Sequence, residues 1–289
     1  MSKHSLSQFL LIFTFFIALM SNDASSSETI YYPRSTAKID PHIDFILEIL
    51  NTALREFPGK YQPVPSAAAY PQTRSINEAI SPYGQIDLVW TMSTNERETK
   101  LIPIRIPLDK GLLGWRIAFV NDKNKDILSQ VKSLNDLKKF DAGQVHDWPD
   151  TEILQNNMLN VVSSSTYEAM FKMLAANRFD YSPRAIFEIW GELASHSSMP
   201  IFIDTHIVLH YPTAFYFFVS PRKPVFANDL KLGIERIITN GQFEKIFQKY
   251  QRDAIQKADI KHRTVIELRN PLLDSRRLPL NRPELWFKP

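Results

Sequence analysis

Residues 143–154, with the sequence GQVHDWPDTEIL, gather a histidine and several acids around Trp148. This composition fits a metal site or an acid/base centre. It fits equally well the start of a helix, with Asp147 or Asp150 as the capping residue and Pro149 in the first turn. The choice between the two decides whether the chain is an enzyme or a binding protein.

The metal interpretation lacks a confirming pattern. His146 has no histidine four residues away on the same helix face, and no second histidine cluster follows. We therefore expect a helix start, with no metal ion, cofactor or catalytic residue. Because acids already occupy the positive end of this helix, we expect Asp147, Trp148 and Asp150 to contact an amino or other cationic group of a ligand rather than an anion.

The N-terminus has the features of a secretory signal peptide. Lys3 precedes an apolar run over 9–20, and the polar stretch SNDASSSE follows it. The run is shorter than the roughly 20 residues that span a bilayer. We expect a signal peptide over 1–24, cleavage near Ala24 and a periplasmic mature protein; an uncleaved anchor is the alternative.

Composition excludes several classes of function. The chain has no cysteine, so it has no disulfide, thiol nucleophile or thiolate metal site. The formal net charge is only +3 and no Lys/Arg cluster is present, so we expect no nucleic-acid partner. The length after the signal peptide allows one large domain or two medium ones.

Strand and helix patterns alternate along most of the chain. The first hundred residues alternate as in a parallel sheet covered by helices. A second alternating set is predicted over 116–221, with the apolar run AFYFFVSP at 214–221 as its last strand. A helical pair follows over 228–250, and a tail rich in Pro, Arg and Leu, 251–289, is expected to wrap the surface.

Three stretches, in this order and spacing, resemble the type II periplasmic solute-binding proteins (extracellular solute-binding family 3), which bind amino acids and similar polar solutes. They are DLVWTMSTNERETKLIPI, SSSTYEAMFKMLAANRFD and NDLKLGIERIITNGQFEKIFQKY. Thr94 and Arg97 match the family's Thr-x-x-Arg, and residues 177–180 match its Gly-Arg-x-Asp turn. Together with HDWPDTEIL and FDYSPR, they resemble a subgroup of solute-binding-like proteins with generally unassigned ligands.

The resemblance implies an α/β fold of two lobes, each a mainly parallel sheet flanked by helices, which hold the ligand in a cleft. It implies a two-stranded hinge near 109–115 and 219–224, with closure as a hinge motion of rigid lobes. The implied divisions are 25–110 for the first part of lobe 1, 111–221 for lobe 2, and 222–289 for the return to lobe 1 with the tail.

Arg97 follows the end of a strand, where open α/β sheets place their ligands. The resemblance implies that its guanidinium binds a ligand carboxylate through two parallel donors. The alternative is a surface arginine paired with Glu96 or Glu98. Further candidates for ligand contact, each with an ordinary turn or core role as its alternative, are the hydroxyls of Thr91, Ser93 and Thr94, the aromatic ring of Trp90, and Tyr32 and Arg34 after the first strand.

Arg184 departs from the pattern of the amino-acid binders. They usually carry an acid near this position to hold the α-amino group of the ligand, and the nearby acid here is Glu188. A second arginine in the cleft would favour a dicarboxylate or another anion. The alternative is an arginine that only bridges the lobes.

We therefore expect an exported, monomeric solute-binding protein for a small polar, carboxylate-bearing ligand, such as an amino acid or a related compound. Its partners would be that ligand and an ABC permease or a membrane sensor. Two alternatives are open. One is an enzyme on the same fold, a dehydratase or lyase with Asp147, Asp150 or Glu188 as general acid. The other is a non-binding interaction module that docks through its tail.

Overall fold

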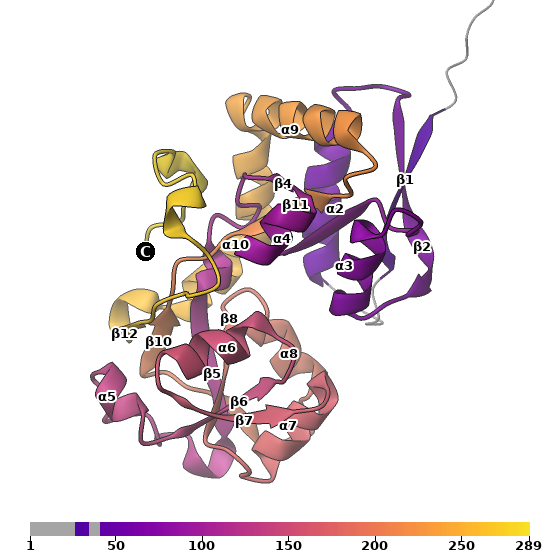
Figure 1. Cartoon of the computed structure of the whole chain (residues 1–289). Helices are drawn as coiled ribbons and strands as arrows, with labels where there is room; N and C mark the ends of the chain where they lie inside the picture. The colour runs from indigo at the N-terminus through magenta and orange to yellow at the C-terminus, as the bar shows by residue number, and fades with distance from the viewer. Residues whose placement is uncertain (1–26, 35–40) are drawn as a thin grey trace, which may run out of the picture.

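The computed structural model describes residues 27–34 and 41–289, so the predicted signal peptide lies outside the described part of the chain. The protein has two lobes joined by short crossings (Figure 1). The first lobe carries smaller sheets and the second lobe a larger, seven-stranded sheet. The two lobes face one another across residues 94–97 of the first lobe and 146–155 of the second.

In the described part of the chain, the first lobe contains two small sheets and five α-helices. The parallel pair consists of β1 (Glu28–Arg34) and β2 (Tyr61–Ala69), and the other sheet of β3 (Leu88–Met92), β11 (Phe215–Val219) and β4 (Ile102–Ile104). The helices are α2 (Pro41–Leu54), α3 (Gln72–Ile80), α4 (Asn95–Lys100), α9 (Pro224–Thr239) and α10 (Gln242–Ala258). Helix α2 buries Phe45, Ile46 and Ile49 in the main core, so its apolar spacing faces inward as the sequence predicts.

The second lobe is built on one mixed sheet. Its strands are β5 (Trp115–Asn121), β6 (Asp141–Val145), β7 (Asn160–Ser164), β8 (Tyr181–Ala185), β9 (Ile201–Ile203), β10 (Ile207–His210) and β12 (Thr264–Glu267). Its helices are α5 (Leu134–Leu137), α6 (Pro149–Asn156), α7 (Tyr167–Ala175) and α8 (Ile189–Ser195). Strand β5 runs antiparallel to β8, β9 and β10, and in the first lobe β11 runs antiparallel to β3 and β4. The sheets are therefore mixed and not mainly parallel, because the strand that follows each crossing runs against its neighbours.

The two crossings lie at 105–114 and 211–214, between strands of different lobes. The expected position of the second crossing, near 219–224, is wrong. The apolar run at 215–219 forms β11, which pairs with Thr91 and Trp90 of the first lobe and not with strands of the second. A run that is apolar on both faces can belong to either sheet, so its composition did not reveal its lobe.

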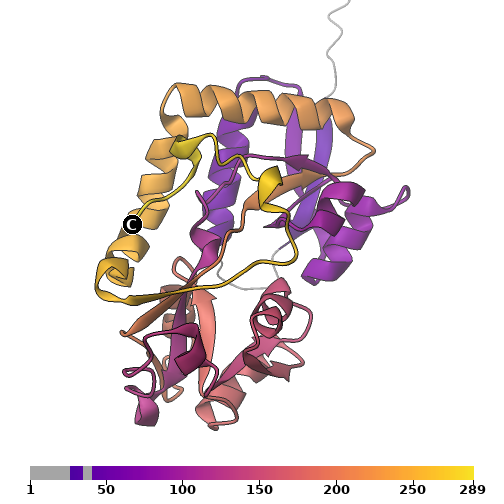
Figure 2. The same cartoon turned by 60° about the vertical axis from the view of Figure 1, so that its left-hand side comes forward.

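The tail also contributes to both lobes. Strand β12 pairs in parallel with β10 and so joins the sheet of the second lobe, although 222–289 was expected to return to the first. Beyond it, the tail crosses to the first lobe (Figure 2). There Leu273 and Leu278 are buried with Tyr216 and Phe218.

Glycines allow close approach at the first crossing. Gly111 has a φ of +77°, and a Cβ atom there would lie 2.7 Å from the ring of Trp286. At Gly114, a Cβ atom would lie 2.3 Å from the carbonyl oxygen of Tyr211 in the second crossing. The two crossings therefore pack side by side, with the end of the tail against the first.

A buried carboxylate holds the first crossing in shape. Asp109 is fully buried and accepts hydrogen bonds from the backbone N–H groups of Gly111 and Leu113, at 3.0 and 2.7 Å. Burial raises the pKa of Asp109 to about 6, and these two hydrogen bonds offset only part of that effect. The carboxyl group of the folded protein is therefore more readily protonated than that of the unfolded chain.

We expect the stability of the protein to depend on pH through Asp109. The raised pKa contributes stability that is fully present below the unfolded pKa near 4 and is lost as pH rises through about 6; a shift of this size corresponds to roughly 3 kcal/mol. Asp109→Asn removes this dependence. Urea unfolding at pH 4, 5.5 and 7 should show the unaltered protein losing stability relative to Asp109→Asn as pH rises.

The exposed Asp122→Asn is the matched control, since it removes a carboxylate that is not buried. A constant difference between the unaltered protein and Asp109→Asn at all three pH values would contradict the prediction.

Candidate functional site

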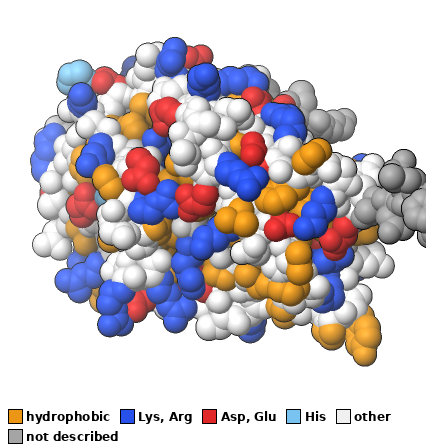
Figure 3. Space-filling model, turned by 90° about the horizontal axis from the view of Figure 1, so that it is seen from above, with side chains coloured by type: hydrophobic (Ala, Val, Ile, Leu, Met, Phe, Trp, Pro, Cys, Tyr) orange, Lys and Arg blue, Asp and Glu red, His pale blue; other side chains and the backbone are white. Residues whose placement is uncertain are grey.

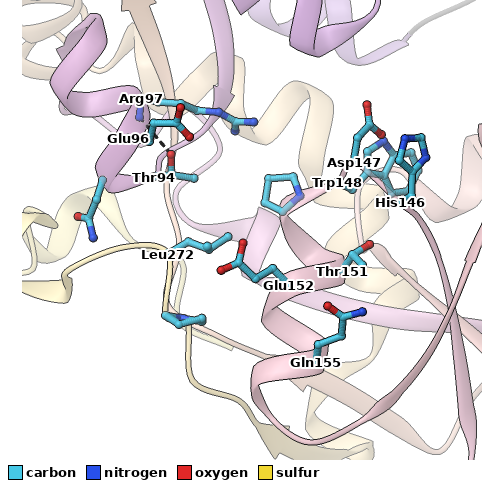
Figure 4. Close-up of a pocket in the computed structure, with 13 residues that line it drawn as sticks. Thr94, Glu96, Arg97, His146, Asp147, Trp148, Thr151, Glu152, Gln155 and Leu272 are labelled. Atoms are coloured by element: carbon cyan, nitrogen blue, oxygen red, sulfur yellow. Dashed lines mark hydrogen bonds between the residues drawn. The ribbon is translucent and has the colours of Figure 1, made fainter.

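Two neighbouring hollows lie between the lobes. The outer cavity, of about 780 Å³, lies between the start of α4, the helix α6 and residues 271 and 272 of the tail (Figure 4). The inner cavity, of about 170 Å³, is lined among others by Thr91, Arg116 and Arg184. Trp148 and Pro149 line both, so the turn before α6 separates the outer space from the inner one.

The first-lobe wall is organised by the start of α4. Thr94 is the N-cap residue of this helix, and its hydroxyl accepts a hydrogen bond from the backbone N–H of Arg97 at 3.2 Å. The hydroxyl of Ser93 is buried and donates to Glu98 Oε1 at 2.7 Å. Thr94 therefore lines the outer cavity, whereas Ser93 supports the turn and lines neither cavity.

The guanidinium of Arg97 is held by protein acceptors on one side and has free donors on the other. Its Nη1 donates to Thr91 Oγ1 at 2.9 Å and to the carbonyl oxygen of Met92 at 2.8 Å, while Nη2 donates to Gln72 Oε1 at 3.4 Å. Burial lowers the pKa of Arg97, and Glu96 and Asp150 partly offset that effect. An arginine side chain is a cation at neutral pH in any case. Among the described residues, Nε and one N–H of Nη2 find no acceptor.

The alternative role for Arg97, an ion pair with a neighbouring acid on its own helix, does not fit the geometry. Glu96 pairs with Lys100 at 2.7 Å, and Glu98 pairs with Arg105 at 2.9 Å. Within residues 27–34 and 41–289, no carboxylate forms an ion pair with Arg97. The guanidinium therefore keeps free donors beside the outer cavity.

The second-lobe wall is α6, and its start differs from the expectation. The N-cap residue is Trp148, with no side-chain cap, and Pro149 is the first helical residue; neither Asp147 nor Asp150 caps the helix. Asp147 is exposed, and its carboxylate accepts a 3.4 Å hydrogen bond from Thr73 of the first lobe. The position of Pro149 was predicted correctly, but the capping role was assigned to acids whose side chains have other partners.

Asp150 is committed to the interior. It forms a 2.7 Å ion pair with Arg116 and accepts a short hydrogen bond from the hydroxyl of Tyr211. Burial raises the pKa of Tyr211 well above its ordinary value, so the phenol stays protonated and donates. Arg116 and Tyr211 are both buried and occupy the carboxylate of Asp150. Asp150 therefore holds α6 in place and is not free to receive a cationic ligand group.

Arg184 is also satisfied within its own lobe. Its Nε donates to Glu192 Oε2 at 2.8 Å, its Nη2 lies 3.1 Å from Glu188 Oε2, and its guanidinium lies 4.5 Å from the ring centre of Trp148. Burial alone would lower the pKa of Arg184, but the carboxylates of Glu188 and Glu192 raise it. Arg184 therefore lines the inner cavity with its charge balanced by Glu188 and Glu192 of its own lobe, and it does not bridge the lobes.

Three further candidates lie away from both cavities. The rings of Tyr32 and Trp90 pack against each other at 5.6 Å, and Arg34 is exposed and donates to the carbonyl oxygen of Ser66 at 2.9 Å. Because successive strand residues point to opposite faces, Trp90 faces away from the cleft when Thr91 faces it. Tyr32, Trp90 and Arg34 therefore line neither cavity.

Several residues that line the two cavities were not predicted from the sequence as ligand contacts. The outer cavity is also lined by His146, Glu152, Gln155, Pro271 and Leu272, and the inner one by Gln72, Arg116 and Phe215. A charged residue inside the apolar strand WRIAFVN was the available signal for Arg116, since a buried arginine needs a partner. The described residues contain no group of three or more His, Cys, Asp or Glu placed to hold a metal ion.

No protein-family model and no curated protein sequence matches the chain. Solved structures do match it. An ancestral arginine-binding protein bound to arginine is 14% identical, with 78% of this chain and 98% of that chain covered and a TM-score of 0.53. The probable amino-acid ABC transporter extracellular-binding protein ytmK from Bacillus subtilis is 14% identical, with 78% and 97% covered and a TM-score of 0.59.

A histidine kinase sensor domain with similarity to periplasmic binding proteins also matches. It is 14% identical, with 78% of this chain and 95% of that chain covered and a TM-score of 0.56. At these levels of identity the similarity shows a common fold. Each of these chains is covered almost whole, whereas about a fifth of this chain lies outside each match.

We expect Glu192→Ala to destabilise the protein by about 3 kcal/mol, because it leaves the buried Arg184 with one carboxylate instead of two. Urea unfolding at neutral pH measures the loss. Glu96→Ala is the control, since it breaks only the exposed pair with Lys100, which should cost at most about 1 kcal/mol. Equal losses of unfolding free energy in the two variants would show that the ion pairs of Arg184 with Glu188 and Glu192 do not stabilise the second lobe.

Proposed function

The chain has the two-lobed α/β fold of the type II periplasmic binding proteins, and on this fold we propose that it captures a small polar, carboxylate-bearing ligand between its lobes. One observation carries the proposal. Arg97 is anchored by Thr91 and Met92, forms no ion pair with any described carboxylate, and keeps free donors beside a cavity of about 780 Å³. A guanidinium held in this way is prepared to bind a carboxylate through two hydrogen bonds.

The opposite wall favours a cationic group on the same ligand. Asp147 and Glu152 line the outer cavity from the second lobe and are exposed. Arg116 and Arg184, by contrast, are neutralised by their own carboxylates, which weakens the case for a dicarboxylate. An amino acid or a related zwitterion, with its carboxylate at Arg97 and an ammonium group near Asp147, satisfies both walls.

The charges of the inner cavity argue against an enzyme. Burial would raise the pKa of Glu188, but Arg184 and Arg116 lower it. Asp150 is bound to Arg116 and Tyr211. A general acid needs a proton near neutral pH, which the lowered pKa of Glu188 disfavours, and the carboxylate of Asp150 is already occupied by its two partners. This supports binding without turnover.

We infer that the protein is exported and acts in the periplasm as a monomer, delivering its ligand to an ABC permease or reporting it to a membrane sensor. The signal-like N-terminal sequence supports export. Within the described part of the chain, no helix is long and apolar enough to cross a membrane. On the face seen in Figure 3, basic side chains are interspersed with acidic ones, which gives no support for a nucleic-acid partner.

A thermal-shift screen of residues 25–289 against amino acids, dicarboxylates, polyamines and peptidoglycan fragments tests the proposal. A ligand at about 100 times its dissociation constant should stabilise the protein by roughly 2.7 kcal/mol, which for a chain of this size raises the melting temperature by about 5–10 °C. We expect a zwitterionic amino acid or a relative to give the shift, and Arg97→Ala to abolish it.

Arg178→Ala is the control, because Arg178 is an exposed arginine of the second lobe outside both cavities. A shift that persists in Arg97→Ala would place the ligand elsewhere. A screen in which no compound moves the transition would favour the interaction-module alternative.

A further inference from the structure

The tail is fastened to the second lobe up to residue 269. Strand β12 pairs with β10, and the backbone N–H of Leu268 donates to the carbonyl oxygen of His210 at 2.7 Å. Asn157, which follows the last residue of α6, then holds Arg269 from both sides: it accepts from the backbone N–H at 2.9 Å and donates to the carbonyl oxygen at 2.8 Å. Residue 269 is therefore fixed to the C-terminal end of α6.

Three residues later the tail is fastened to the first lobe. The backbone N–H of Asn95, the first residue of α4, donates to the carbonyl oxygen of Leu272 at 2.8 Å. The side chain of Asn95 accepts from the backbone N–H of Asp274 at 3.2 Å. Leu273, the next residue, is buried in the core of the first lobe. Residue 272 is therefore fixed to the N-terminal end of α4.

The rest of the tail secures this attachment on the first lobe and at the hinge. Arg282 forms a double ion pair with Glu235 of α9, with N–O distances of 2.6 and 3.0 Å. The backbone N–H of Phe287 donates to the carbonyl oxygen of Lys110 in the first crossing at 2.7 Å. The tail beyond residue 272 is therefore fixed to the first lobe and to the first crossing, so residue 272 moves together with the first lobe.

Residues 269–272, which we call the strap, thus join the two helices that face each other across the outer cavity (Figures 2 and 4). The side chain of Asn270 donates to the carbonyl oxygen of Pro212 at 2.9 Å, so the strap begins beside the second crossing. Three residues reach at most roughly 10 Å when fully extended. The strap therefore limits how far α4 and α6 can separate at this edge.

The other edge of the cleft has a much weaker closure. There the lobes are joined across the outer cavity by the 3.4 Å hydrogen bond from Thr73 of α3 to Asp147, between two exposed side chains. Such a contact contributes little and breaks without cost to the rest of the fold. The two edges of the same cleft therefore differ: the covalent chain closes one edge, whereas away from it the lobes are held by non-covalent contacts, such as this long hydrogen bond and the stack of His42 of α2 on Phe187 of the second lobe, with ring centres 4.6 Å apart.

We propose that the strap is a third connection between the lobes, which fixes the width of the cleft at the end lined by Pro271 and Leu272, so that the lobes open at the edge of Thr73 and Asp147. The site opens at one edge only, and the ligand enters there and comes to rest against an apolar wall that does not move. The role in ligand entry rests on the proposed function, whereas the restraint on opening does not.

Distance measurements on the unliganded protein test the restraint. The chain has no cysteine, so spin labels can be placed at Tyr83→Cys and Lys172→Cys, which are exposed positions in the first and second lobes. A six-residue Gly/Ser segment inserted between Asn270 and Pro271 adds up to roughly 20 Å of reach to the strap. We expect a longer mean distance and a broader distribution than with the unaltered tail.

The same segment inserted between Leu280 and Asn281 is the matched control. Both residues are exposed and lie beyond the strap, so this insertion should leave the label distances unchanged. Distributions that are the same in the two insertion variants, whether both widened or both unaltered, would overturn the proposal. Because no ligand is present, this result is independent of the outcome of the ligand screen.

A milder variant covers the case in which the strap insertion fails to fold, as judged by circular dichroism. Asn157→Ala removes the two hydrogen bonds that hold Arg269 to α6 and leaves the length of the tail unchanged. A distribution broader than that of the unaltered protein supports the restraint, and an identical distribution contradicts it.

Discussion

The ion pair between Arg116 and Asp150 sets the geometry on which the cleft depends. Arg116 lies in β5, a strand buried along its whole length, where an unpaired guanidinium would be strongly destabilising. Asp150 meets this charge from the first turn of α6, and the hydroxyl of Tyr211 completes the cluster. The first turn of α6 is thereby held against the strand that enters the second lobe, and this fixes Trp148 between the outer and inner cavities.

Pairing inside the cleft decides where a charged ligand can be recognised. Arg116 and Arg184 are both buried, but Asp150, Glu188 and Glu192 neutralise them, and the ring of Trp148 covers Arg184. The inner cavity can therefore offer little net attraction to an anion. Among the arginines that line the two cavities, Arg97 alone forms no ion pair with a described carboxylate. The proposed function therefore places the recognition of charge further out, in the space between α4 and α6.

Local patterns in the sequence predicted what local forces determine. The start of α6 near Pro149, the inward face of α2 and the place of Arg97 just after a strand follow from helix-start signals, periodicity and the resemblance. The placement of β11 did not follow, because a run that is apolar on both faces suits either sheet. The partners of Arg116 and Arg184, and the tail residues in the cavity wall, depend on contacts between distant segments. Trp90 is a different case: strand alternation already implied that it and Thr91 face opposite sides.

The same long-range contacts connect recognition with motion. Pro212 in the second crossing, Asn270 in the strap and Gly111 against Trp286 bring every described passage between the lobes to one side of the cleft. Rigid lobes joined along one side turn about that side, and the opposite edge then travels furthest. Arg97 belongs to the first lobe and Asp147 to the edge of the second lobe that we propose to open, so closure would bring together the groups proposed to bind the carboxylate and the ammonium group of the ligand. A zwitterionic ligand that engages both groups would gain its second contact only in the closed state, which is the differential affinity that drives closure.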